Sequence, residues 1–272
     1  MTDFSSAEAL GRAAEKYFGI KADHDDAEKL RQYIIGAYGS ADGETVNRVF
    51  SSGEASDFLT VNETYFFRES AHFYFLRDLL PGFTRKEIRV CSAAVSCGCE
   101  AYSIAMLIEA YNRGTEKPLR YHIDAFDINP RVIEAANLGI FGERTLREDG
   151  SCFRCLADPY LKKIESAAGV KYGIDPSLKK NISFFVHNLM EKLPAKEYDL
   201  IFFRNAFIYF TPGCRERILT NLIGVLEEGG YLIMGVSETA GVRHSGIEGR
   251  NRNDVFYFRK PSNRNLFTET GL

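Results

Sequence analysis

The stretch that most constrains the fold is Ile88 to Ser103, which reads I-R-V-C-S-A-A-V-S-C-G-C-E-A-Y-S. A short apolar run ends in small residues, passes Gly98 and opens into a segment whose apolar residues have helical spacing. This order of strand, tight loop and helix begins an open α/β nucleotide-binding domain. The loop lacks G-x-G-x-x-G, so on its own it is equally typical of strand–helix packing without a ligand.

Apolar strands and amphipathic helices alternate along the chain from Ile88 onward. Such units, joined by short crossovers, build a parallel sheet with right-handed connections. A loop separates the last two predicted strands, so we expect them to form an antiparallel hairpin at one edge. The alternation lapses over residues 142–181, which indicates an inserted subdomain. The predicted strands are Ile88–Val95, Tyr121–Ile128, Ile182–Val186, Leu200–Phe203, Tyr231–Val236 and Val255–Phe258, and the predicted helices are Tyr102–Asn112, Pro130–Asn137 and Cys214–Leu226.

The N-terminal segment, up to Thr60, contains no convincing strand. Apolar residues at helical spacing predict helices over Ala7–Phe18, Ala27–Tyr38 and Glu44–Phe50, with the acidic turn D-H-D-D between the first two. We therefore predict a small, all-helical N-terminal domain.

A further helix is predicted to begin within Thr60–Arg68 and to end at Pro81-Gly82. Thr60 and Glu63 have the spacing of a capping box at its start. With this helix as the link, the chain divides into an N-terminal domain over residues 1–70 and a sheet-containing domain over residues 71–272.

Composition restricts the class of protein. The formal net charge of −3 argues against a nucleic-acid binder driven by phosphate contacts, and acidic side chains clearly outnumber basic ones in the segment up to Thr60. No apolar run approaches the roughly 20 residues needed to cross a bilayer. The N-terminus has no basic-then-apolar signal sequence, so we expect a cytoplasmic protein that does not insert into the membrane.

The six cysteines are expected to be free thiols in a cytoplasmic chain of this size. Cys97 and Cys99, together with Cys152 and Cys155, could supply four zinc ligands. The first pair has the wrong spacing for a zinc knuckle and lies in the glycine loop, so we predict no metal site.

Polar residues follow four of the predicted strands, where the ligand of such a sheet binds. Asp127 ends the second strand, where a carboxylate accepts two hydrogen bonds from the cis-diol of a ribose. Asn188 and Leu189 follow the third, and an amide beside an apolar side chain suits the edge and face of adenine. Each polar group alone is equally typical of a structural cap, but the four together favour a nucleotide-containing ligand. The four strand ends carry Ser96–Glu100, Asp127, His187–Leu189, and Arg204, Asn205 and Tyr209.

At these residues the chain resembles the chemotaxis protein methyltransferase (CheR) family over about residues 15–260. The family's N-E-T-x-F-F-R matches Asn62–Arg68, and its S-A-[AG]-x-S-x-G-E-E-P-Y-S-x-A matches Ser92–Ala105, with Cys99 and Ala101 in place of the first Glu and the Pro. The remaining matches are D-I-[DN] at Asp127–Asn129, G-[IV]-[YF] at Gly139–Phe141, H-N-L at His187–Leu189, R-N-x-x-I-Y-F at Arg204–Phe210 and G-x-S-E at Gly235–Glu238.

The resemblance implies a Rossmann-like methyltransferase sheet and transfer of a methyl group from S-adenosylmethionine to glutamate side chains of a protein. The expected acceptor is the cytoplasmic domain of a chemoreceptor, and the enzyme is expected to be a monomer. Arg68 and Tyr209 would face the reacting methyl and the incoming carboxylate. The residues implied to contact the cofactor are Asn62, Thr64, Arg68, Glu100, Asp127, Asn188, Leu189, Arg204 and Asn205.

Departures from the family pattern leave alternatives open. The second N-terminal helix offers only Lys29 and Arg31 amid acidic residues, where family members carry several basic residues that grip the receptor. The segment around Ala167-Ala168-Gly169 is also short for a receptor-binding loop. The alternatives are therefore the same chemistry on a non-receptor protein or small acid, and a catalytically silent module that senses S-adenosylmethionine. A nicotinamide dehydrogenase is disfavoured, since Asp127 lies farther beyond Gly98 than the spacing of roughly 20 residues in the dinucleotide-binding fingerprint.

Overall fold

The computed structural model describes residues 4, 6–147, 153–166, 169–194, 197–240 and 242–262. Its centre is a seven-stranded sheet in which neighbouring strands are parallel from β6 through β8, and the last two strands, β10 and β9, are antiparallel to their neighbours. This mostly parallel α/β sheet confirms the predicted fold class. In spatial order the strands are β6 (Ile182–Val186), β2 (Arg120–Asp127), β1 (Glu87–Ala93), β7 (Tyr198–Phe203), β8 (Leu226–Met234), β10 (Val255–Arg259) and β9 (Glu248–Arg252).

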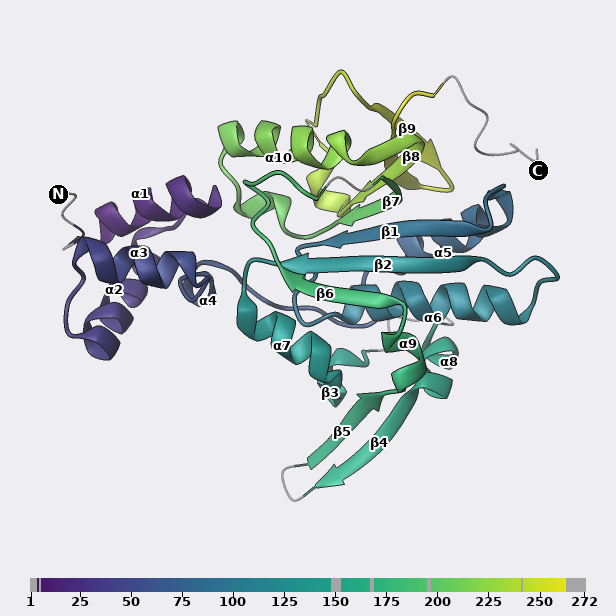
Figure 1. The fold of residues 1–272 in the computed structure, drawn as a ribbon, viewed down its shortest axis with the longest axis horizontal. Helices are drawn as coiled ribbons and strands as arrows, with labels where there is room; N and C mark the ends of the chain where they lie inside the picture. Colours follow the sequence, from purple (N-terminus) through teal and green to yellow (C-terminus); the bar gives the residue numbers. More distant parts are fainter. Residues whose placement is uncertain are drawn as a thin grey trace.

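Side chains of the central strands alternate between two apolar layers, because successive residues of a strand point to opposite faces. On one face, Ile88 and Val90 of β1 join a cluster with α5 (Ser70–Leu79), α6 (Cys99–Arg113) and α7 (Pro130–Leu138). On the other face, Cys91 and Ala93 join a cluster with α10 (Pro212–Gly224) and the N-terminal helices. Figure 1 shows α6 and α10 on opposite sides of the sheet.

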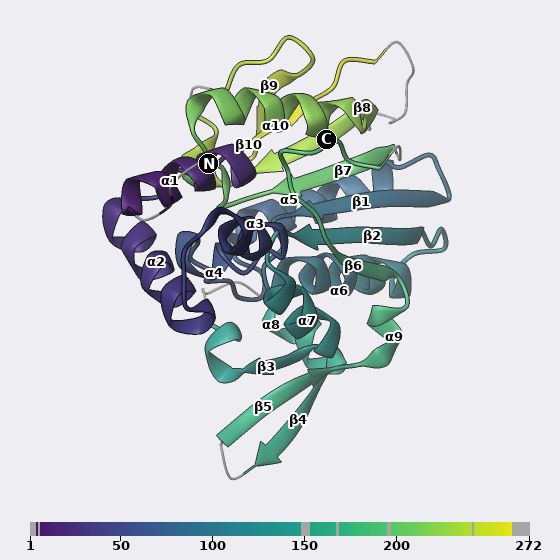
Figure 2. The same ribbon diagram turned by 60° about the vertical axis from the view of Figure 1, so that its left-hand side comes forward.

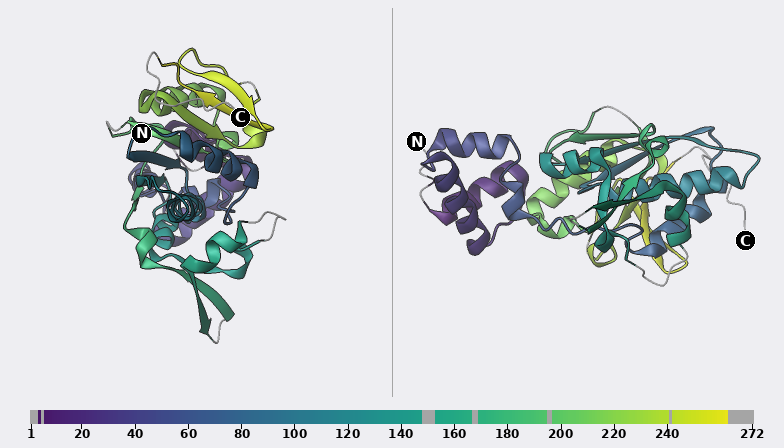
Figure 3. Two further views of the ribbon diagram at one scale, coloured as in Figure 1. Left: turned by 90° about the vertical axis from the view of Figure 1, so that its right-hand side faces the viewer. Right: turned by 90° about the horizontal axis from the view of Figure 1, so that it is seen from below.

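The N-terminal helices lie beyond the carboxyl ends of the parallel strands, at one end of an elongated molecule (Figures 1 and 3). Ion pairing and backbone bonds attach them there: Asp57 pairs with Arg131 at 2.9 Å, and the Lys21 N–H donates to the Tyr209 carbonyl at 2.9 Å. The position of these helices closes one side of the region where the strands end. They are α1 (Ala7–Phe18), α2 (His24–Tyr38), α3 (Gly43–Ser51) and the single turn α4 (Ser56–Leu59).

A small antiparallel sheet projects from the main domain below α7 (Figure 2). Its strands, in spatial order, are β3 (Ile140–Gly142), β5 (Gly169–Ile174) and β4 (Leu161–Ser166). Strands β4 and β5 fall inside the region where the helix–strand alternation lapses, and β3 ends at its first residue, although Ala167 and Ala168 lie outside the described residues. Short helices complete the chain: α8 (Arg154–Ala157), α9 (Pro176–Lys179), η1 (Leu80–Gly82), η2 (Glu143–Thr145), η3 (Asp158–Tyr160), η4 (Phe207–Tyr209) and η5 (Val236–Glu238).

The predicted helix start within Thr60–Arg68 is wrong, since α5 begins only at Ser70. Residues 60–69 are irregular because their backbone bonds go to other parts of the fold. The Phe66 N–H donates to the Thr145 carbonyl and the Phe67 N–H to Ser103 Oγ, and both Phe67 and Glu69 have φ of 56°.

The predicted capping box is also wrong. The Thr60 hydroxyl donates backward to the carbonyl of Ser56, and Glu63 pairs with Arg147 at 2.6 Å. Both side chains therefore form their bonds elsewhere, and neither of them caps the start of a helix.

Three smaller predictions need correction. The acidic D-H-D-D segment is a helix start and not a turn, because the Asp23 side chain caps α2 by accepting from the N–H of Asp26. β10 does pair antiparallel with β8, but the edge is formed by β9, a strand of exposed polar residues without apolar alternation. α10 ends at Gly224, before its predicted end at Leu226, since β8 begins at that leucine. The division of the chain at residue 70 stays a prediction.

Candidate active site

A pocket opens where the parallel strands end, beneath the N-terminal helices. Loops after β1, β2, β6 and β7 form one side, and the irregular segment of residues 60–68 forms the other. Every predicted site residue lines this pocket: Asn62, Thr64, Arg68, Glu100, Asp127, Asn188, Leu189, Arg204, Asn205 and Tyr209.

The loop after β1 brings backbone close to the end of β2. Ala94, Ser96 and Gly98 all have positive φ, and a Cβ on Gly98 would lie 3.0 Å from the Cβ of Ala136. This conformation directs the Ser96 N–H to Asp127 Oδ2 at 2.9 Å, and the Asn129 N–H donates to Oδ1 at 3.0 Å. Burial raises the pKa of Asp127. The carboxylate also lines the pocket, and its remaining acceptor capacity can serve a ribose hydroxyl.

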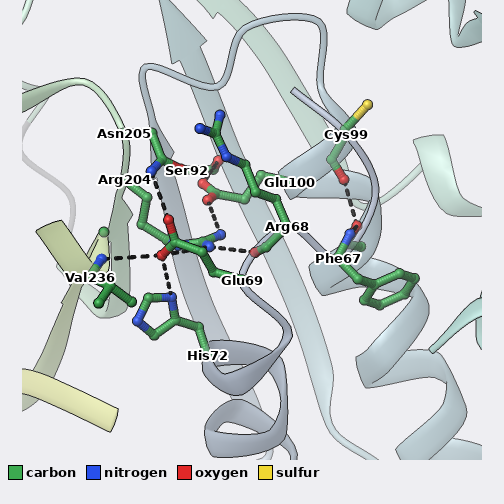
Figure 4. Close-up of polar contacts among 12 residues, drawn as sticks. Phe67, Arg68, Glu69, His72, Ser92, Cys99, Glu100, Arg204, Asn205 and Val236 are labelled. Atoms are coloured by element: carbon green, nitrogen blue, oxygen red, sulfur yellow. Dashed lines mark hydrogen bonds and ion pairs between the residues drawn. The ribbon is translucent and has the colours of Figure 1, made fainter. Parts of the chain in front are cut away.

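Arg204 is a buried cation between two carboxylates at the pocket wall (Figure 4). It lies 3.0 Å from Glu100 and 3.3 Å from Glu69, and it also donates to the backbone carbonyl of Arg68. Ser92 donates to the other oxygen of Glu100 at 2.7 Å. The terminal nitrogens of Arg204 are thus used within the protein, and only its Nε has no hydrogen-bond partner among the described residues. Arg204 is placed to hold the pocket wall together.

Glu69 is the residue of this network that sequence reasoning missed. Its carboxylate accepts from the Asn205 side-chain amide at 2.8 Å and from the Val236 N–H at 3.2 Å, and it faces His72 at 3.3 Å (Figure 4). The guanidinium of Arg204 and these donors hold the pKa of Glu69 below its usual value despite burial. Its only sequence signal is its place directly after Arg68, since it belongs to no periodic pattern.

Glu238, from the last matched motif, shapes the turn after β7. Its carboxylate accepts backbone N–H bonds from Asn205 at 2.6 Å, Phe207 at 2.7 Å and Gly235 at 3.0 Å. Burial raises its pKa. These bonds support Asn205 at a φ of 57° and so orient η4, the helix that carries Tyr209.

Arg68 and Tyr209 approach the pocket from different parts of the chain. The Arg68 side chain points away from Glu69 (Figure 4), donates to the Glu63 carbonyl at 2.7 Å and lies 5.8 Å from the centroid of the Tyr65 ring. Tyr209 is half-buried, and its hydroxyl has no hydrogen bond to the described residues. A guanidinium and a phenol therefore line the same cavity.

The loop after β6 contributes both a structural bond and a group available to a ligand. The Asn188 amide donates to the Tyr17 carbonyl at 2.6 Å and accepts from the Met190 N–H at 2.9 Å, so it ties α1 to the sheet. Leu189 supplies apolar surface. His187 also lines the pocket, and its Nε2 is buried without a hydrogen-bond partner among the described residues.

Within the described ranges, no group of three or more His, Cys, Asp or Glu side chains is arranged to hold a metal ion. Cys97 and Cys99 are neighbours and Cys155 is exposed, while Cys152 lies outside the described residues. The same ranges contain no helix with the length and apolar character to span a membrane.

The chain is similar in sequence to chemotaxis protein methyltransferases. The sequence family described as CheR methyltransferase, SAM binding domain, matches residues 62–248. A chemotaxis protein methyltransferase of Borreliella burgdorferi is 37% identical over 196 residues, which are 68% of this chain and 67% of that protein. One from Vibrio anguillarum is 33% identical over 192 residues, again 68% and 67%. A TehB-like SAM-dependent methyltransferase structure from Corynebacterium glutamicum aligns with 69% of this chain and 84% of its own, at 12% identity and a TM-score of 0.38.

Proposed function

The chain belongs to the CheR family of S-adenosylmethionine-dependent protein-glutamate methyltransferases, and from this membership we propose that it methylates glutamate side chains on the cytoplasmic domains of chemoreceptors. The products would be glutamate methyl esters and S-adenosylhomocysteine. A receptor's cytoplasmic domain is reached from the cytoplasm, which is where we place the enzyme, as a monomer.

The pocket residues fit the chemistry of the cofactor. The Asp127 carboxylate lines the pocket and can accept from a ribose hydroxyl, and His187 Nε2 is a buried polar atom in need of a partner. Leu189 offers an apolar face for a purine, and Arg68 a cation for an aminoacyl carboxylate. We propose that these groups, with Asn62, Thr64, Glu100, Asn188, Arg204 and Asn205, hold S-adenosylmethionine.

The proposed mechanism needs positioning rather than proton transfer. When bound, S-adenosylmethionine supplies the methyl group on an electrophilic sulfonium. A glutamate acceptor is already ionised at neutral pH, so no general base is required. Arg68 would orient a carboxylate at the pocket, and the Tyr209 hydroxyl would hydrogen-bond beside the site of transfer.

The observation that carries this proposal is the convergence of Asn62–Arg68 with four strand ends. These segments come from widely separated parts of the chain, yet their side chains line a single pocket. If the polar side chains only capped the four strand ends, there would be no reason for the Arg68 guanidinium, from the N-terminal side, to line the same pocket.

The test is transfer of labelled methyl from S-adenosylmethionine to purified chemoreceptor cytoplasmic fragments. We expect label in base-labile esters, and no label on fragments in which the accepting glutamates are replaced by alanine. If the protein binds S-adenosylhomocysteine but labels no receptor fragment, the cofactor assignment holds and the acceptor assignment fails.

One observation favours a second acceptor. On α2, Lys29 pairs with Asp26 at 2.8 Å and Arg31 with Glu28 at 2.7 Å, so both cations are partly neutralised within their own helix. A helix of this kind offers little free positive charge to grip a chemoreceptor, which favours a non-receptor protein or a small acid as the acceptor. Proteins captured on the immobilised enzyme can be incubated with labelled S-adenosylmethionine. The second candidate predicts that a captured protein other than a receptor takes up the label.

A further inference from the structure

Two thiols flank the glycine of the loop after β1. Cys97 Sγ and Cys99 Sγ lie 3.9 Å apart, on either side of Gly98. Cys97 is half-buried and Cys99 fully buried. A disulfide has a sulfur–sulfur distance of about 2.05 Å, so a bond between them requires an approach of about 2 Å.

The two thiols differ in reactivity. A hydrogen bond from the Cys99 thiol lowers the pKa of Cys97, whereas burial raises the pKa of Cys99 well above its usual value. The thiolate is the nucleophilic form of cysteine, and of the two only Cys97 has partial access to solvent. Cys97 is therefore suited to react first with a small oxidant, and Cys99 to resolve the product.

The loop that carries these thiols also holds the pocket. The residue before Cys97 donates its N–H to Asp127, and the residue after Cys99 pairs with Arg204. Ser103 connects the loop with the opposite wall: its hydroxyl donates to the Cys99 carbonyl at 2.7 Å and accepts from the Phe67 N–H at 2.9 Å. Drawing the sulfurs together would displace groups on both sides of the pocket.

We propose that Cys97 and Cys99 form a redox-modification site that controls cofactor binding. The Cys97 thiolate attacks a hydroperoxide, so that an S–O bond forms, the O–O bond breaks and the departing oxygen leaves as an alcohol or water. Cys99 then attacks the sulfenic sulfur, so that an S–S bond forms, the S–O bond breaks, and the thiol proton leaves with hydroxide as water. The two thiols lose two electrons and the peroxide gains them. The inference rests on the proposed place of the cofactor in this pocket, and not on the identity of the acceptor.

The experiment treats the full chain with hydrogen peroxide, maps its disulfides by peptide mass spectrometry, and measures the dissociation constant of S-adenosylhomocysteine. We expect a bond between Cys97 and Cys99 and a rise in that constant of about tenfold, reversed by dithiothreitol. The Cys97→Ser variant should keep its affinity after peroxide. The matched control Cys155→Ser, which removes an exposed thiol of α8, should respond like the wild type.

The proposal is overturned if no bond between Cys97 and Cys99 is found, if the bond forms without loss of affinity, or if Cys97→Ser loses affinity to the same extent. Cys97→Ala serves as a second variant if Cys97→Ser does not fold. Reduced wild-type protein that fails to bind S-adenosylhomocysteine would instead contradict the proposed function.

Discussion

Individual charged residues decide the shape of the pocket wall. Arg204 is buried, and an unpaired buried cation would cost several kcal/mol. Glu69 and Glu100 balance its charge, and hydrogen bonds from Ser92 and Asn205 satisfy the outer oxygens of these two carboxylates. The network therefore holds β7, α6 and the segment before α5 in one arrangement.

Replacing Glu69 by glutamine should destabilise the protein by about 3 kcal/mol, because Arg204 loses one of its two buried counter-charges. Urea unfolding followed by circular dichroism measures this change. Glu63→Gln is the matched control: its pair with Arg147 is half exposed, so the loss should be below about 1 kcal/mol. Equal losses in the two variants would contradict a central role for Glu69.

Arg68→Ala should reduce kcat/KM for methyl transfer by about 100-fold, since it removes the guanidinium proposed to orient a carboxylate in the pocket. Initial rates at varied S-adenosylmethionine measure the effect. Arg147→Ala is the control, because this guanidinium also lies over the Tyr65 ring, at 5.1 Å, but does not line the pocket. A similar loss in both variants would assign the effect to packing on Tyr65.

His72 should make stability depend on pH. Burial, and then the neighbouring Arg204, lower its pKa from 6.5 to about 4, while Glu69 opposes the shift. Protonation of His72 therefore favours the unfolded chain. The stability that depends on neutral His72 is fully present above about pH 6.5 and is lost as the pH falls toward about 4. The free energy of unfolding should fall by up to about 1.4 kcal/mol per pH unit in this range.

The measurement for His72 is urea unfolding from pH 7.5 to 4 in the wild type and in His72→Gln. In the variant, the free energy of unfolding should lack the part of its decline with pH that His72 causes. The difference in this free energy between the wild type and the variant should therefore narrow as the pH falls. Parallel curves would show that His72 does not titrate in this way. The comparison is needed because burial raises the pKa of Asp127 and Glu238, which shifts stability in the opposite direction.

At the scale of elements, the loop between β1 and α6 decides whether a ligand can reach the backbone. Its left-handed positions turn the chain sharply and direct the Ser96 N–H to Asp127. Because Gly98 has no side chain, α6 packs close to α7 and β6; a Cβ there would lie only 3.0 Å from Ala136 and 3.2 Å from Phe184. The loop is thus set by contacts with elements that come later in the sequence.

Gly98→Ala should destabilise the protein by about 1–3 kcal/mol, because φ is +92° and the new methyl group would lie 3.0 Å from Ala136. Gly36→Ala, inside α2 and with nothing within 4 Å of its added methyl, should stabilise by about 0.5–1 kcal/mol. Thermal unfolding of both variants checks the pair. The same sign of change in both would contradict the role assigned to Gly98.

On the scale of the whole molecule, the pocket exists because the N-terminal helices dock against the strand ends. Asn188 bonds to the end of α1, and Gly53 packs so closely on the Ile128 carbonyl that a Cβ there would lie 2.5 Å from the oxygen. Residues 60–68 run between these helices and the sheet, and many of their side chains face the pocket.

Binding of S-adenosylhomocysteine should therefore slow amide exchange in residues 60–68 by about tenfold. The reason is that a ligand in the pocket contacts both these residues and the strand-end loops, and so stabilises their packing against each other. Hydrogen–deuterium exchange with mass spectrometry measures this. Peptides from β4 and β5, which contribute no residue to the pocket, should show no change. Equal slowing in both regions would indicate general stabilisation instead.

Local pattern alone determined much of this protein. The alternation of apolar strands and amphipathic helices predicted the parallel sheet, because the periods of side-chain burial are properties of a single segment. Polar residues at four strand ends predicted the place of the pocket, since parallel strands end at one edge. The motifs from Asn62 to Glu238 predicted the family and its cofactor.

Only the tertiary structure decided the rest. Residues 60–69 have the composition of a helix start, yet bonds to Thr145 and Ser103 keep them irregular. Glu69 carries no local signal, because its role comes from Arg204, Asn205 and Val236, which are all distant from it in the sequence. β9 has no apolar alternation and is specified by pairing with β10. Contacts between distant segments depend on how the elements pack together, and a local pattern of residues does not contain that information.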